Sequence, residues 1–258
     1  MNDIISMLAE KYYVLYPEMV RIPVRVEVCE CISDAYLRIR PEHEHRMSRQ
    51  ALDEINGMVA LPKTIEEPIS ILISKNRVLE YTNDKSMTWV GTFAHELTHA
   101  IDFYQIARKG NHKNYDSFQE ADENRMFQLW TEYHAKKLGY SFLRSVLEVD
   151  LDSNNIDGAL EYIITKEWPA QKERFFQEYR STHNANEQMY LSMHILGRYS
   201  VWCDLFPSEF NSKSIENEFP HHLWMKDLLE FLRKHETLDA ISEKFDYFED
   251  VLKLNWVF

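Results

Sequence analysis

Residues 94–100 read Ala-His-Glu-Leu-Thr-His-Ala, and they lie in the middle of a stretch whose apolar residues recur at helical spacing. That spacing predicts a long helix from about 86 to 108. Its apolar stripe consists of Val90, Phe93, Ala94, Leu97, Ile101 and Tyr104. Gly110 follows as the expected end of the helix. The helix decides the fold, because the segments before and after it differ in periodicity.

The segments before this helix predict another helix and a small sheet. Helical spacing covers residues 2–16, and apolar residues alternate with charged ones at about 22–32, as in a half-buried strand. Further strands are predicted at 55–61 and 69–74, and the polar stretch 33–54 ends in a short helix. The residues that carry these patterns are Ile5, Leu8, Tyr12 and Leu15, then Val24, Val26 and Val28, and finally Ile69, Ile71 and Ile73.

The segments after the long helix are predicted to be helical. A Ser-x-x-Glu pattern at 117–120 predicts a helix from there to about 137, with Gly139 as its end. Asn184 resembles a helix cap and opens a helix that reaches about 202. Two more helices are expected at 221–258. The fold class is therefore α+β, with a short N-terminal sheet preceding the long helix and a mostly helical C-terminal half. Two domains are expected: a catalytic domain at 1–150, and a helical subdomain at 151–258 packed on it.

Composition limits the classes of protein to consider. A formal net charge of −13 disfavours phosphate backbones, so we expect no nucleic-acid partner. Three cysteines in no spaced framework indicate a reducing compartment. The N-terminus lacks the basic start and apolar run of a signal peptide, and no apolar stretch approaches the roughly 20 residues that span a bilayer. We expect a cytoplasmic protein with no membrane partner.

His95 and His99 are the strongest chemical signal. Residues four apart on a helix lie one turn apart on the same face, so both imidazoles can reach one metal ion. Glu96 lies beside His95 and can reach a water at that ion without ligating it. This pattern predicts a zinc site with Glu96 as general base. The alternative is a solvated helix face that carries two histidines.

A catalytic zinc site needs a third protein ligand and an open position for water. Glu132 is the predicted ligand, because it lies well inside an apolar helix where an unpaired carboxylate would be costly. Glu120 and His134 are the alternatives. Asp102 follows His99 by three residues and is either a hydrogen-bond acceptor for a ligand histidine or an ordinary solvent-exposed residue.

Amide hydrolysis also needs a donor for the oxyanion of the tetrahedral intermediate. Tyr190 and His194 are the predicted donors, in one helical segment that also contains Arg198. Tyr140 is a further option. For each of them, a buried polar residue without a catalytic role is the alternative.

Residues 94–100 resemble the active helix of gluzincin metallopeptidases, including the thermolysin type, and the segment around Glu132 resembles their glutamate-ligand helix. The resemblance implies a zincin-like fold, zinc held by His95, His99 and Glu132, and Glu96 as the general base. The wider layout is similar to small cytoplasmic gluzincins of the phage-immunity type. That similarity implies that the strand at 69–74 pairs with an extended peptide substrate.

The sequence therefore predicts a zinc metallopeptidase that acts on a peptide or protein. One alternative is a zinc hydrolase for another amide or ester. The other is an inactive or highly specific zincin that acts as a regulatory or binding protein. A strand edge beside the zinc would favour the peptidase, whereas closure of the cleft by the polar loop 107–117 would favour the regulatory protein.

Overall fold

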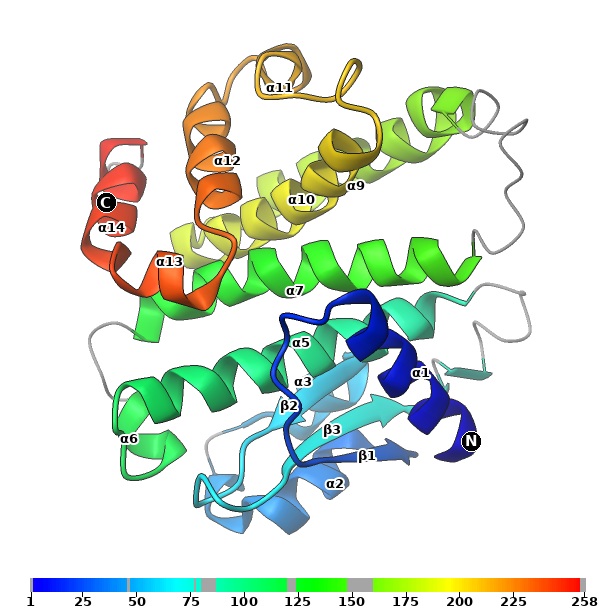
Figure 1. The fold of residues 1–258 in the computed structure, drawn as a ribbon, viewed down its shortest axis with the longest axis vertical. Coiled ribbons are helices and arrows are strands. Elements are labelled where there is room, and N and C mark those ends of the chain that lie inside the picture. The colour runs from blue at the N-terminus through cyan, green and yellow to red at the C-terminus, as the bar shows by residue number, and fades with distance from the viewer. Residues whose placement is uncertain are drawn as a thin grey trace. The chain divides into compact units, whose positions relative to one another are not determined.

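The computed structural model describes residues 2–45, 47–76, 78–79, 87–119, 124–147 and 160–255 (Figure 1). The first half contains α1 (Asn2–Leu15), β1 (Val24–Cys29), α2 (Ile32–Ile39), the 3₁₀ segment η1 (Pro41–His43), α3 (Arg49–Glu54), β2 (Gly57–Ala60), β3 (Ile69–Ser74), α5 (Thr88–Lys109) and α6 (Tyr115–Gln119). The second half contains α7 (Asn124–Leu147), the π-helical segment η4 (Ile163–Glu167), α9 (Trp168–Ser181), α10 (Ala185–Leu205), α11 (Ser214–Glu218), α12 (Trp224–Lys234), α13 (Leu238–Ser242) and α14 (Phe245–Asn255).

The chain forms two compact units, and α7 contributes residues to both. Unit 1 comprises 1–124 with 138–146, and unit 2 comprises 125–137 with 147–258. The predicted domain boundary at 150 lies outside the described residues. The predicted α+β class is confirmed, since the described strands all belong to unit 1 and the described elements of unit 2 are helical.

Unit 1 is built around a three-stranded sheet of order β1-β3-β2. β3 pairs with β1 in parallel and with β2 in antiparallel register. Ile69, Ile71 and Ile73 belong to the core cluster that includes α5, whereas Leu72 packs with residues of α2 and α3 on the other face. Figure 1 shows α5 and α2 on opposite faces of the sheet. Because both faces of β3 are covered, its sequence is almost continuously apolar.

The sheet corrects one prediction. β3 is hydrogen-bonded to a neighbouring strand on each side, so it has no free edge to pair with a peptide. The prediction that the strand at 69–74 binds an extended substrate is therefore wrong. β2 is an edge strand of the described sheet.

Gly139 corrects a second prediction. The helix that was expected to end at this glycine continues to Leu147 as α7. Leu138, Phe142 and Leu143 are buried on either side of Gly139, so the apolar periodicity runs through it.

The predicted cap at 117–120 includes Glu120, which lies outside the described residues. α2 was not predicted either, although its residues Ile32 and Tyr36 are buried one turn apart.

Unit 2 holds the N-terminal part of α7 through a cluster of charges. The Lys137 Nζ lies 2.8 Å from Asp204 Oδ2 and 2.6 Å from Glu236 Oε1. Tyr133 is fully buried, and its hydroxyl lies 2.8 Å from Ser200 Oγ on α10.

The predicted cap of α10 is confirmed, since the Asn184 side chain accepts hydrogen bonds from two backbone N–H groups of the first turn. The C-terminal part contains α12, α13 and α14 instead of the two helices expected there.

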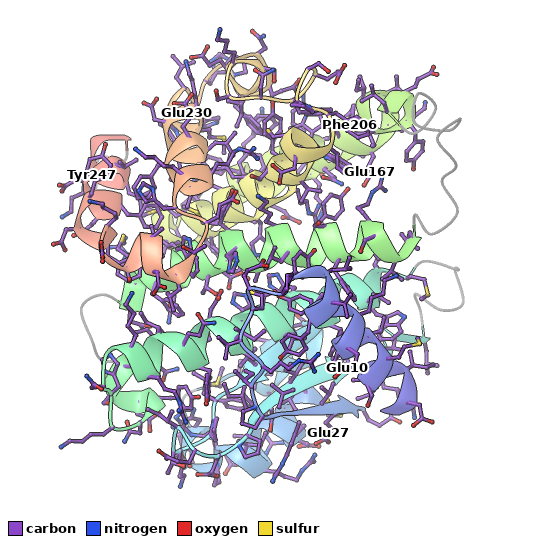
Figure 2. The ribbon with its side chains drawn as sticks, viewed as in Figure 1. Glu10, Glu27, Glu167, Phe206, Glu230 and Tyr247 are labelled. Atoms are coloured by element: carbon purple, nitrogen blue, oxygen red, sulfur yellow. The ribbon has the colours of Figure 1, made fainter. Side chains whose placement is uncertain are left out.

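The surface carries the acidic character of the composition. Glu10 and Glu27 of unit 1 form exposed ion pairs with Arg21 and Arg38 (Figure 2). Ion pairs this exposed add little to stability, so they matter more for solubility than for the fold. Among the described residues, no helix combines the length and apolar character needed to cross a bilayer.

Candidate metal centre

α5 carries the two histidines of the predicted site. Its apolar stripe is buried in unit 1, which fixes the rotation of the helix about its axis. The Nε2 atoms of His95 and His99 lie 3.1 Å apart. Two nitrogens bound to one tetrahedral zinc at about 2.0–2.1 Å would lie about 3.3 Å apart, so the pair is spaced for a shared ion.

α1 is hydrogen-bonded to the part of α5 that carries the motif. Thr98 is fully buried, and its hydroxyl donates to the carbonyl of Ala94 at 2.8 Å. The Tyr12 hydroxyl lies 2.7 Å from Thr98 Oγ1 and therefore donates to it. Burial raises the pKa of Tyr12 well above its usual value, so the phenol keeps its proton. The hydrogen bond joins α1 to the turn of α5 that carries both histidines.

Glu96 is 8% exposed, and it lies beside the edge strand β2. A Cβ added at Gly57 would lie 3.0 Å from Thr92 Cγ2 and 3.2 Å from Glu96 Cγ. The absence of a side chain at Gly57 therefore lets β2 approach α5 at Glu96. The sequence pattern predicts a strand at Gly57 but gives no signal for this contact.

α7 packs directly against the motif at Gly139. A Cβ at this position would lie 2.8 Å from the Gly91 carbonyl oxygen, 2.9 Å from His95 Cβ and 3.0 Å from the His95 nitrogen. Leu143 meets Gly91 one turn further along α7. Higher numbers on α7 thus meet lower numbers on α5, so the two helices are antiparallel where they cross. Gly139 is required because α5 leaves no space for a methyl group.

We expect Gly139→Ala to destabilise the protein by about 1–3 kcal/mol, the range for overpacking a close contact. At an exposed helix position the same change would stabilise by about 1 kcal/mol. Urea denaturation measures the difference. The control is Ser6→Ala on the exposed face of α1, which should stay within about 0.5 kcal/mol. A Gly139→Ala variant that is more stable than the wild type would contradict the close contact.

Glu132 lies two turns before Gly139 on α7. Residues seven apart lie on the same face of an α-helix, about 10 Å along its axis, so Glu132 shares the Gly139 face. One ligand atom from each of His95, His99 and Glu132 can be chosen so that all lie within 4.8 Å of one another. That limit is within about 1.5 Å of the roughly 3.3 Å spacing in a tetrahedral zinc site. Two imidazoles and one carboxylate are a donor set that suits zinc.

Glu132 is also hydrogen-bonded to α10. The His194 Nε2 lies 2.9 Å from Glu132 Oε2, and 24% and 17% of the two side chains are exposed. Burial, together with the positive charge of Lys136, lowers the pKa of His194 to about 4. The imidazole is therefore neutral at pH 7. Because an ionised carboxylate only accepts hydrogen bonds, Nε2 carries the proton and donates a hydrogen bond to Glu132 Oε2.

A third glycine makes this contact possible. A Cβ at Gly197 would lie 2.8 Å from the Tyr133 carbonyl oxygen and 2.9 Å from Lys136 Cβ. α10 therefore packs against the backbone of α7 one turn from His194. The sequence offers no signal for this contact other than a glycine inside a helical segment.

The remaining predicted residues differ in burial and in the rings that they contact. Asp102 is 2% exposed, so the interpretation as a solvent-exposed residue is wrong. His134 is buried and stacks on Trp130, with ring centroids 4.8 Å apart. The ring centroids of Tyr190 and His194 lie 4.3 Å apart, and Tyr190 is 40% exposed. Tyr140 and Arg198 are half-buried.

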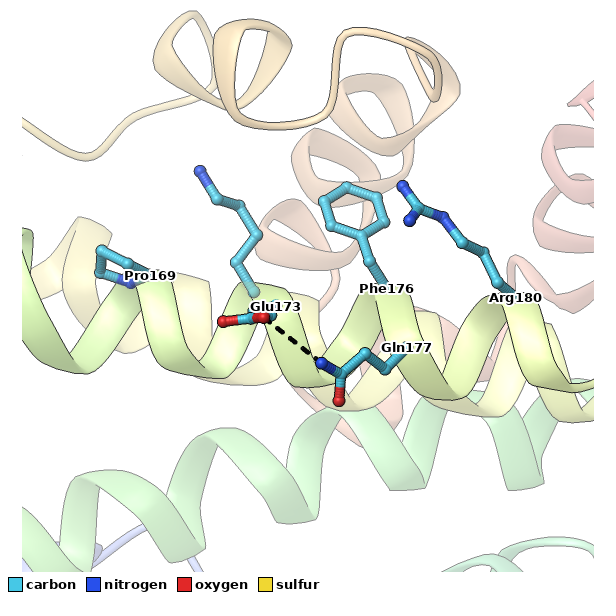
Figure 3. Close-up of a pocket in the computed structure, with 6 residues that line it drawn as sticks. Pro169, Glu173, Phe176, Gln177 and Arg180 are labelled. Carbon is cyan, nitrogen blue, oxygen red and sulfur yellow. Dashed lines mark hydrogen bonds between the residues drawn. The ribbon is translucent and has the colours of Figure 1, made fainter.

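A separate hollow of about 380 Å³ follows one face of α9 (Figure 3). Glu173 and Gln177 on its floor are joined by a hydrogen bond of 3.3 Å. The lining residues are Pro169, Lys172, Glu173, Phe176, Gln177 and Arg180. None of the predicted site residues lines it.

Comparison with family models, curated proteins and solved structures finds no match to this chain.

Proposed function

We propose that the chain is a zinc-dependent peptidase with a zincin-like arrangement of its N-terminal sheet and active helix. The observation that carries the proposal is the convergence of His95, His99 and Glu132, whose ligand atoms come within 4.8 Å of one another. A solvated helix face does not explain a set in which His99 is 6% exposed. Two imidazoles and one carboxylate that converge from α5 and α7 form a donor set that one zinc ion can bind together.

The residues have distinct roles in this proposal. His95, His99 and Glu132 would hold the zinc ion. When bound, the ion would act as a Lewis acid and lower the pKa of a water molecule. Glu96 is the general base: it accepts a proton from the attacking water and passes it to the leaving nitrogen. Tyr190 and His194 are the two alternative donors to the oxyanion, because both lie on the turn of α10 that reaches Glu132.

A peptide substrate is favoured by the position of β2. This strand is paired on one side with β3 in the described sheet, and Gly57 brings it against Glu96. An extended peptide added to such an edge gains main-chain hydrogen bonds along its length. The cytoplasm is the proposed location, and the three cysteines are unbridged, as a reducing compartment requires.

Cleavage of a diverse peptide library by the purified, zinc-loaded protein tests this function. We expect new peptide termini by mass spectrometry, no cleavage after chelation, and recovery when zinc is restored. An uncut library from protein that carries one zinc per chain would contradict a general peptidase and favour the regulatory or non-peptidase alternative.

A further inference from the structure

One carboxylate oxygen of Glu132, Oε2, lies within hydrogen-bonding distance of His194 on α10. His194 Nε2 lies 2.9 Å from Oε2, across a sequence separation of 62 residues. A metal ligand that binds through one oxygen needs its other oxygen held, because a freely rotating carboxylate presents its lone pairs in many directions. The contact therefore has the geometry of an orienting hydrogen bond.

The backbone around this contact is built for close approach. Gly197 lies one turn beyond His194, and a Cβ there would come within 2.8 Å of the Tyr133 carbonyl oxygen. Tyr133 of α7 is fully buried, and its hydroxyl is hydrogen-bonded to Ser200 of α10, the helix that carries His194 and Gly197. α7 and α10 are thus held together immediately C-terminal to the Glu132–His194 pair, which limits the movement of the imidazole away from the carboxylate.

We propose that His194 is a positioning residue: its Nε2–H fixes the carboxylate of Glu132 so that the other oxygen faces the metal. The inference rests on the proposed zinc site and extends it. It also separates the two predicted oxyanion donors, because an Nε2–H committed to Glu132 leaves that role to Tyr190. The alternative is a hydrogen bond that only stabilises the packing of α10 on α7.

Three substitutions of the full chain distinguish these roles. His194→Phe keeps a flat ring and removes the donor. His194→Gln places an N–H at about the reach of Nε2, and His194→Asn places one too short of it. Zinc affinity is measured by competition with a chromophoric chelator, and the visible spectrum of the cobalt-substituted protein reports the ligand geometry. Melting of the metal-free protein measures fold stability separately.

We expect His194→Phe and His194→Asn to weaken zinc binding about 10–100-fold and to change the cobalt spectrum, as is typical when a hydrogen bond to a metal ligand is lost. His194→Gln should stay within about threefold of the wild type. Zinc affinity in His194→Phe equal to the wild type, or affinity in His194→Gln as weak as in His194→Phe, would overturn the inference.

The same titrations separate this inference from the proposed function. If the wild type binds zinc no better than a His95→Ala/His99→Ala variant, the zinc site itself is wrong and both proposals fail. If the wild type binds zinc at these histidines and His194→Phe binds it equally well, only the positioning role fails. A lower melting temperature with unchanged zinc affinity identifies a purely structural hydrogen bond and also overturns the inference.

Discussion

Glu96→Gln is expected to keep its zinc and its fold and to lose hydrolysis by at least about 10²–10⁴-fold, the range for general acid–base catalysis. Gln preserves the size of the side chain and much of its hydrogen bonding, but it cannot accept a proton from water. Glu96 is 8% exposed, and its Cγ would lie 3.2 Å from a Cβ at Gly57. Because Gln has nearly the same shape as Glu, the amide fits in this confined position. The measurement compares turnover on one library peptide, zinc content and thermal melting.

Glu10→Gln is the matched control for this variant. It removes the same charge from a side chain of unit 1 that is 65% exposed, and turnover should be unchanged. A Glu96→Gln variant that cleaves the peptide at the wild-type rate would show that another group accepts the proton.

Glu132→Ala is expected to weaken zinc binding by about 10²-fold or more. Structural zinc sites, which have four protein ligands, bind with about 10–16 kcal/mol in total, which is about 3 kcal/mol per ligand or about 10²-fold in affinity. The cost should be larger than that of His194→Phe, because the ligand itself is lost. Chelator competition on the purified variant measures the affinity.

His134→Ala separates Glu132 from the alternative ligand two residues away. His134 stacks on Trp130 at 4.8 Å, so its loss should lower the melting temperature and leave zinc affinity unchanged. Full zinc affinity in Glu132→Ala, together with its loss in His134→Ala, would reverse the assignment of the third ligand.

The elements that the sequence predicts well are those whose local pattern agrees with their burial. β3 has the predicted bounds, Ile69–Ser74, because both of its faces are covered and four of its six residues are isoleucine or leucine. α5 matches to within two residues at its start and one at its end, since a long apolar stripe fits only helical spacing. His95 and His99 follow from that helix alone, because their separation is local.

The features that sequence analysis missed depend on contacts between distant segments. A lone glycine in a helical segment resembles a helix end, and only the burial of Phe142 and Leu143 beyond Gly139 reveals that α7 continues. The edge position of β2 depends on strand order, which alternation does not encode. The Glu132–His194 hydrogen bond joins residues 62 apart, so no local spacing predicts it.

Zinc content of the purified wild-type chain, measured beside His95→Ala and His99→Ala after equal exposure to zinc and desalting, tests the central claim most directly. We predict one zinc per chain in the wild type and its loss in either variant. The spacing of 3.1 Å between the two Nε2 atoms is the basis, because both nitrogens must bind the same ion. A wild type without zinc, or full occupancy in either single variant, would contradict the metal site and the function built on it.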